Sequence, residues 1–303
     1  MASALHVAGL SPDLVSDVRQ LTQFPFMVNA LEAGALVAVM AGVVGWFMVL
    51  RRESFAGHTL SVMAFPGATG ALLIGLSASV GYFGFCAFCA LILGVARPRE
   101  DRRRSEETAV TGAVQAFGLA CGFVFLSLYR GVLAGYENLL FGSFLGITRG
   151  QVLTLLIVCV AALGAFALIG RPLLFASVDE RVARARGVPV RALSLAFLVV
   201  LGLAVAATAQ ITGALLVFAL LVAPPATAQL ITARIGASLA LSVLIGVAIT
   251  WVGLALAYFY NRPVGFYITA LAFLAYATAR LVRAVIDHPT LLRRRTPALE
   301  VAG

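Results

Sequence analysis

The stretch from Gln210 to Thr232, QITGALLVFALLVAPPATAQLIT, decides the fold. It is almost entirely apolar, and a helix needs roughly 20 such residues to cross a bilayer. Two consecutive prolines, Pro224 and Pro225, interrupt the run and remove two backbone donors. In lipid the freed carbonyl groups must find partners, which only neighbouring helices or a cavity supply. We therefore expect a broken span around Pro224, Pro225 and Thr227 at the centre of a helical bundle, although an ordinary kinked span has the same pattern.

The composition places the rest of the chain in the membrane as well. Of 303 residues, 61% are hydrophobic and only 12% are charged, and the mean hydropathy is +1.01. A water-soluble domain cannot cover that much apolar surface. The 22 basic residues are all arginine and cluster between apolar runs, which indicates membrane topology and not a nucleic-acid groove. The four cysteines lie inside apolar runs and predict no disulfide framework.

The apolar runs predict an all-α integral membrane protein with about nine transmembrane helices, within a range of eight to ten. The expected spans are approximately residues 26–50, 58–76, 82–96, 108–129, 151–170, 192–208, 210–232, 236–260 and 264–282. Pro66-Gly67 is expected to break the second span. Residues 130–149 are too short and too interrupted for a confident span, so a re-entrant or interfacial turn is predicted there.

Three regions and one orientation follow from these spans. Residues 1–25 are predicted to form an extracytoplasmic tail with a short amphipathic helix on the membrane surface. Residues 26–283 form the transmembrane domain, and residues 284–303 form a basic tail. A cytoplasmic carboxy terminus places 18 of the 22 arginines inside the cell. The four outside are Arg19, Arg130, Arg149 and Arg262. The amino terminus is therefore predicted outside, in a multi-pass protein of the plasma (inner) membrane.

The loop after the fifth span predicts a short helix over residues 178–186. Ser177 and Glu180 fit a capping box, in which the serine accepts from the first turn and the glutamate reaches back. Acidic residues follow at the positive helix end and arginines precede the negative end. Gly187 can adopt the left-handed stop. Such a helix either docks on another subunit or is a solvated linker. Its defining residues are Ser177, Asp179, Glu180, Arg184 and Gly187.

Four segments resemble the membrane permease subunits of ATP-binding-cassette importers for zinc, manganese and iron. They are Val49–Gly57 with the following Leu60-Ser61 and Pro66-Gly67, then Leu140–Ser143, Val178–Pro189 and Gly213–Ala228. The likeness covers roughly residues 26–280, in order. It implies the translocation subunit of an ATP-driven importer for a divalent transition metal, zinc or manganese. The chain has no phosphate-binding glycine-lysine loop, so it is not expected to be an enzyme, and ATP hydrolysis belongs to a partner.

The resemblance also implies a set of partners. These are a second copy of the permease, two ATPase subunits below the membrane and a metal-binding lipoprotein above it. The loop over residues 178–189 resembles the ATPase-coupling loop of the family. No nucleic acid and no permanently bound cofactor are expected, because the metal ion is the cargo.

The chain departs from the family pattern at the positions that line the metal path. The family usually has an aspartate and a histidine at the positions of His58 and Val62. It often has an aspartate before the last span, where this chain has Asn261. His58 can still bind zinc or manganese through nitrogen, or it is a structural residue. We expect the translocation path to include His58, Glu32 near the outer end of the first span, and Asn261.

Other functions remain open on the sequence. An importer of a metal chelate or a vitamin keeps the architecture and suits the missing ligands. A secondary carrier needs ionisable groups in the membrane, and the spans offer few besides Glu32 and His58. An accessory or structural membrane protein would leave the capped helix without a purpose. Cys86 and Cys89 share one helix face and suit soft metals, or they are small apolar residues.

Overall fold

The computed structural model describes residues 14–95, 104–129, 142, 146–260 and 262–287, in which the regular elements are α-helices. The helices are α1 (Leu14–Gln23), α2 (Pro25–Leu50), α3 (Ser54–Leu73), α4 (Ala78–Val95), α5 (Arg104–Leu128), α7 (Arg149–Val178), α8 (Glu180–Ala185), α9 (Val190–Thr212), α10 (Ala214–Ile231), α11 (Ile235–Tyr260) and α12 (Val264–Asp287).

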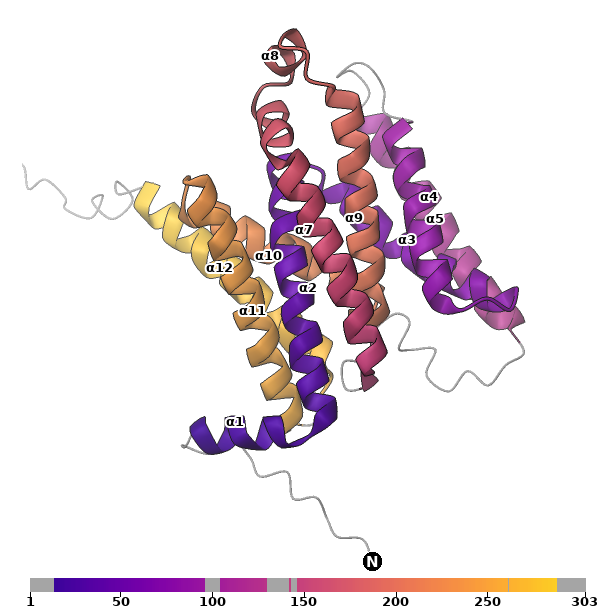
Figure 1. The fold of residues 1–303 in the computed structure, drawn as a ribbon, viewed down its shortest axis with the longest axis vertical. Helices are drawn as coiled ribbons and strands as arrows, with labels where there is room; N and C mark the ends of the chain where they lie inside the picture. The colour runs from indigo at the N-terminus through magenta and orange to yellow at the C-terminus, as the bar shows by residue number, and fades with distance from the viewer. Residues whose placement is uncertain (1–13, 96–103, 130–141, 143–145, 261, 288–303) are drawn as a thin grey trace, which may run out of the picture.

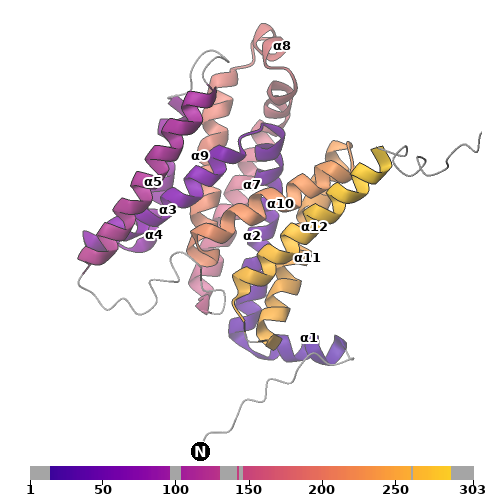
Figure 2. The same ribbon diagram turned by 180° about the vertical axis from the view of Figure 1, so that it is seen from behind.

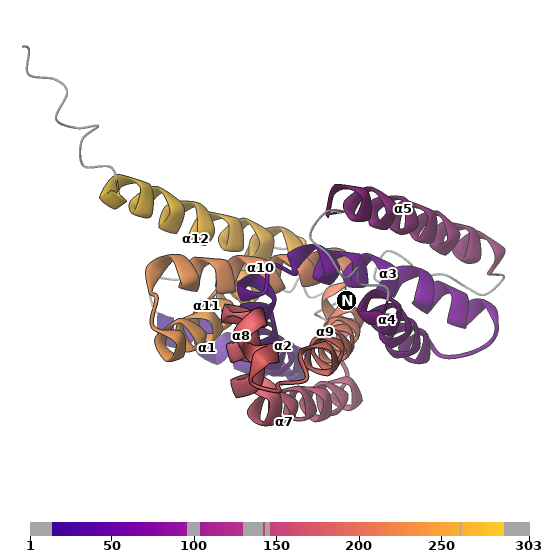
Figure 3. The same ribbon diagram turned by 90° about the horizontal axis from the view of Figure 1, so that it is seen from above.

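Helix α2 lies at the centre of the bundle and packs against α7, α9, α10 and α11. Helices α3, α4 and α5 form one flank and α10, α11 and α12 form the other (Figure 1). The view from behind shows α10 crossing between the flanks beside α2 (Figure 2). Helix α1 lies across one end of the bundle, and α8 stands at the opposite end (Figures 1 and 2). Seen from above, α5 packs on the outer side of α3 (Figure 3).

Each predicted span overlaps one long helix, except that the span expected over residues 210–232 also includes the end of α9. Within the described residues, six helices are long and apolar enough to cross a membrane. They are α2, α4, α7, α9, α11 and α12. Helices α5 and α10 carry the shorter apolar segments Gly112–Leu128 and Leu216–Ile231. The all-α membrane fold class is confirmed, whereas the orientation of the spans stays a prediction.

The predicted breaks at the prolines are wrong. Helix α3 continues through Pro66, and α10 continues through Pro224 and Pro225. Each proline removes the hydrogen bond to the carbonyl four residues earlier, and its ring crowds that carbonyl. The bonds on either side persist, and membrane helices tolerate such losses where packed neighbours cover the freed groups.

The stretch from Gln210 to Thr232 is not one span. Helix α9 ends at Thr212, and Gly213 separates it from α10 with a φ of 75°. A side chain at this positive φ would be strained, which explains why glycine marks the junction. Gln210 therefore belongs to α9, where its side chain accepts a hydrogen bond from Ser79 of α4 at 3.1 Å.

Polar side chains join α2 to α10 and α11 inside the apolar bundle. The Trp46 indole donates to Ser238 Oγ at 2.9 Å, and Ser242 Oγ donates to the Gly42 carbonyl at 2.9 Å. From α10, Gln229 Nε2 donates to the Trp46 carbonyl at 2.9 Å. Buried polar groups need such partners, so these bonds help to set the register between the central helix and its flank.

The predicted regional boundaries are only partly covered. Helix α12 runs to Asp287 and so continues past residue 283, where the tail was expected to begin. The helix predicted near the amino terminus is α1. Most of the predicted re-entrant turn, residues 130–141 and 143–145, lies outside the described residues.

Candidate functional site

His58 lies in the first turns of α3, close to where the chain leaves α2. Its ring packs against Phe218 of α10 with centroids 4.7 Å apart. The side chain is half-buried, and its Nδ1 atom is buried without a hydrogen-bond partner. His58 therefore presents an imidazole nitrogen at the contact between α3 and α10, and neutral imidazole nitrogen is a common metal ligand.

The double proline of α10 faces the bundle. Pro224, Pro225 and Thr227 are all buried, and Thr227 Oγ1 donates to the Ala223 carbonyl at 2.7 Å. Pro225 frees the carbonyl of Leu221, and this carbonyl packs directly on Gly45 of α2. A Cβ at residue 45 would overlap the Leu221 oxygen and lie 3.0 Å from Pro225 Cγ. The freed carbonyl is thus covered by a glycine that allows the two backbones to touch.

Two of the predicted path residues, Glu32 and His58, do not come together. Glu32 pairs with Arg149 of α7, with Oε2 2.7 Å from the guanidinium, and the glutamate side chain is 44% exposed. About 27 Å of helix separates Glu32 from the end of α2 that precedes His58. Asn261 lies outside the described residues. In the part of the chain that the structure describes, no group of three or more histidine, cysteine, aspartate or glutamate side chains could hold a metal ion.

The two cysteines of α4 pack inside the bundle. Cys86 is fully buried, and its thiol donates to the Leu60 carbonyl of α3 at 3.6 Å. Cys89 is half-buried and packs against the same apolar core. Both are free thiols, and a cysteine in such surroundings behaves as a small apolar residue.

Helix α8 is the short capped helix that the sequence predicts, but its cap differs. Asp179 is the N-cap, and its Oδ1 accepts from the Val182 amide at 2.9 Å. The prediction that Ser177 caps this helix is wrong, because Ser177 still belongs to the last turn of α7. Glu180 does not reach back to a capping serine but pairs with Arg184 one turn later. Serine and aspartate are both favoured N-cap residues, so the sequence alone does not show which of Ser177 and Asp179 caps the helix.

The carboxy-terminal end of α8 follows the prediction. Gly187 has a φ of 78°, and the amide of Val188 donates to the Ala183 carbonyl at 3.0 Å. This is the bond of a Schellman stop. Ala183 is fully buried against Ala176 and Val190, so α8 is seated between the end of α7 and the start of α9. The other side chains of α8 are exposed.

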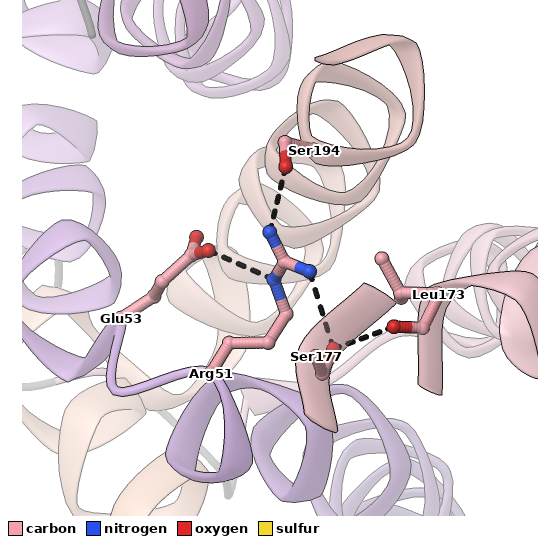
Figure 4. A network of polar contacts seen from close by, with 5 residues as sticks. All are labelled: Arg51, Glu53, Leu173, Ser177 and Ser194. Carbon is pink, nitrogen blue, oxygen red and sulfur yellow. Dashed lines mark hydrogen bonds and ion pairs between the residues drawn. The ribbon is translucent and has the colours of Figure 1, made fainter. Parts of the chain in front are cut away.

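A buried arginine lies directly behind α8. We call Arg51, Glu53, Ser177 and Ser194 the Arg51 cluster (Figure 4). Arg51 Nε donates to Glu53 Oε1 at 2.8 Å, and its two terminal nitrogens donate to Ser177 Oγ at 3.2 Å and Ser194 Oγ at 2.7 Å. The side chains of Arg51 and Glu53 are only 8% and 9% exposed. The guanidinium also packs 5.2 Å from the centroid of Phe197.

Sequence reasoning missed this cluster. Arg51 and Arg52 end the first span, and both fit a pair of topology-setting charges. In the structure Arg52 is exposed while Arg51 turns inward. The acceptors of Arg51 come from α7 and α9, more than 120 residues later in the chain. The only local signal is Glu53, which is placed to accept from Arg51.

The chain matches the ABC 3 transport family over residues 23–283. It is 30% identical over 260 residues to the manganese transport system membrane protein MntC of Halalkalibacterium halodurans, covering 86% of this chain and 88% of that protein. It is 28% identical over 283 residues to the chelated iron transport system membrane protein YfeC of Yersinia pestis, covering 92% and 95%.

A solved structure, that of PsaBC from Streptococcus pneumoniae in complex with Fab, has the same fold. Its matching chain superposes with a TM-score of 0.78 at 27% identity, covering 88% of this chain and 95% of that one. The sequence match and the fold both extend over almost the whole helical bundle described above. This chain is therefore a member of the ABC 3 transport family.

Proposed function

We propose that this permease carries a divalent transition metal, manganese or zinc, into the cell. The observation that supports this most is the family match, which extends over residues 23–283 and so includes α2 to α11 and most of α12. Relatives of similar length are named for manganese and for chelated iron transport. The permease is a membrane subunit, and ATP hydrolysis belongs to a separate protein.

The proposed orientation places α8 and the carboxy terminus in the cytoplasm. Arginines support it, because they concentrate at the ends of the helices on the side of α8. There α8 would meet the ATPase subunits of an assembly that holds two permeases. A metal-binding lipoprotein would deliver cargo at the opposite end, where Glu32 and Arg149 form their ion pair.

His58 is the proposed contact of the ion in this chain. It has a buried, unpartnered ring nitrogen where α3 meets α10, the helix with the double proline. Glu32 and Asn261 remain proposed path residues, but no contact in the structure supports them. Glu32 pairs with Arg149, and Asn261 lies outside the described residues. The contact would be transient, which suits a cargo that must be released.

One observation supports a second candidate, import of a metal chelate. The described residues hold no cluster of ligands, and Val62 stands where the family resemblance expects a histidine. A chelator that supplies its own donor atoms would need fewer from the protein. The two candidates differ in whether His58 contributes to uptake of the bare ion.

Replacing His58 should separate the two candidates. We expect His58→Ala to lower uptake of free manganese by at least about tenfold, since even second-shell changes at metal sites cost about that much. His58→Asp should restore part of the uptake, and His58→Asp with Val62→His should restore more. The measurement is cellular manganese, zinc and iron in a strain whose own permease is deleted, at matched permease abundance. Unchanged uptake in His58→Ala would make this residue structural and favour the chelate.

The cap of α8 gives an independent test of the proposed ATPase contact. Asp179→Ala should destabilise α8 by about 1 kcal/mol, because the Val182 amide loses its acceptor. We expect fewer ATPase subunits to co-purify with the permease and uptake to fall. Asp179→Asn preserves the cap and is the matched control. Equal ATPase recovery with the alanine and asparagine variants would contradict a role for α8 in docking.

A further inference from the structure

The Arg51 cluster joins four helix ends, and it connects the proposed ATPase-docking helix with the proposed ion-contacting helix. Arg51 follows the last residue of α2, and Glu53 is the residue that precedes α3. Ser177 lies in the last turn of α7, just before α8, and Ser194 lies near the start of α9. Four helix ends, from three parts of the chain, thus meet at one buried guanidinium (Figure 4).

Helix α8 packs against the two segments that carry the serines. Its buried residue Ala183 packs between Ala176 of α7 and Val190 of α9. Packed interiors transmit displacement because they have few voids. A force on α8 therefore acts on the end of α7 and the start of α9, and a serine hydroxyl of each segment accepts a hydrogen bond from Arg51.

The same guanidinium restrains the start of α3. Glu53 accepts from Arg51 Nε, and the Glu53 carbonyl accepts from the Gly57 amide at 3.1 Å, in the first turn of α3. His58 is the next residue. A displacement of Arg51 or Glu53 is thus passed on to His58 through about one turn of helix.

The turn that carries Arg51 has a strained backbone. Arg52 has a φ of 57°, the single positive φ outside glycine among the described residues. The amide of Glu53 donates to the Met48 carbonyl at 2.9 Å, so α2 ends in a Schellman-like stop with arginine where glycine is usual. This conformation costs free energy for a residue with a Cβ. It also directs Arg51 inward while Arg52 stays exposed.

We infer that Arg51 is a positioning residue that couples α8 to the start of α3, so that events at the ATPase are transmitted to His58. The inference rests on the proposed function, because it requires an ATPase bound at α8. A planar guanidinium suits this role, since its fixed fork of donors holds three acceptors at once. Lysine has the same charge, but its single ammonium cannot span three acceptors on separate helices.

The experiment compares Arg51→Lys with Arg52→Lys in the complete complex of permease, ATPase and binding protein. Both variants keep the net charge and the arginine-rich side of the membrane. In proteoliposomes with manganese, transport per ATP hydrolysed should fall about tenfold in Arg51→Lys, the size expected for lost hydrogen bonds to a buried charge. ATP hydrolysis itself should continue, and Arg52→Lys should match the wild type.

Hydrogen exchange tests the same inference without reference to the cargo. Adding ATP to the complex should change exchange of the amides of residues 55–59 in the wild type and in Arg52→Lys, but not in Arg51→Lys. Ser194→Ala removes one acceptor with little change in volume, so it should give an intermediate response even if Arg51→Lys assembles poorly. This readout would still respond if manganese were the wrong cargo, so a failure of the proposed substrate is recognised separately.

Two results would overturn the inference. One is an undiminished ATP-dependent change at residues 55–59 in Arg51→Lys. The other is an unaltered ratio of transport to hydrolysis in Arg51→Lys with only the amount of assembled complex reduced. Either result would mean that the Arg51 cluster only stabilises the packing of the helix ends and does not couple α8 to α3.

Discussion

Replacing Gly45 of α2 with alanine is expected to disrupt the permease more than Gly42→Ala on the same helix. The new Cβ would overlap the Leu221 carbonyl oxygen and lie 3.0 Å from the Leu221 carbonyl carbon and from Pro225 Cγ. Backbone atoms of a packed helix cannot turn aside as a flexible side chain can. Overpacking costs about 1–3 kcal/mol at ordinary sites, so we expect the upper end of that range here.

The control for Gly45→Ala is Gly164→Ala on α7, because a Cβ at residue 164 would meet nothing within 4 Å. Alanine favours helix by about 1 kcal/mol over glycine, so this variant should be as stable as the wild type or more so. The measurement is the thermal midpoint of the detergent-solubilised permease, followed by size-exclusion chromatography. Equal midpoints for the two variants would contradict the close contact of α2 with α10.

A second large effect is expected at Gly81 of α4. A Cβ there would overlap the Gly67 carbonyl oxygen and lie 2.7 Å from the Ala71 Cβ, while a Cβ on Gly67 would lie 2.7 Å from the Gly81 oxygen. The backbones of α3 and α4 therefore touch at a pair of glycines. Gly81→Val should separate the two helices and displace α3, which carries His58, and uptake should be lost together with stability.

Gly84 on the same helix is the matched comparison for Gly81. A Cβ at Gly84 would meet no atom within 4 Å. We expect Gly81→Ala to be destabilising and Gly84→Ala to be neutral or stabilising by about 0.5–1 kcal/mol. Stability changes of opposite sign at two glycines of one helix would distinguish the effect of packing from that of helix propensity. Two variants that shift the thermal midpoint in the same direction would refute the glycine contact.

The long apolar helices and the short helix α8 could be predicted from the sequence, because they depend on local signals. Long apolar runs separated by arginines locate the helices. Gly187 ends α8 as expected, since a positive φ favours glycine. The continuity of α3 through Pro66 and of α10 through Pro224 and Pro225 was not predictable in this way, because neighbouring helices determine whether a freed carbonyl is covered.

The site depends still more on distant contacts. No sequence pattern distinguishes Arg51 from Arg52, because the burial of Arg51 depends on Ser177 and Ser194 in later helices. Ser177 matches a capping motif, yet its hydroxyl donates to Leu173 O at 2.6 Å and accepts from Arg51. The packing of His58 on Phe218 likewise joins residues 160 positions apart in the chain. Glu32 was expected near the path, but it forms an ion pair with Arg149 at the start of α7. The two residues are far apart in the sequence, so this pairing depends on how α2 and α7 pack.

ATP-driven metal import by this permease is tested most directly by uptake into sealed proteoliposomes that hold the permease with its ATPase subunits. The binding protein loaded with manganese is added outside, and ATP is enclosed with the ATPase. We predict that manganese accumulates inside only when hydrolysable ATP is present, and that an imposed proton or sodium gradient cannot replace it. Accumulation driven by such a gradient without ATP would contradict the account and identify a secondary carrier.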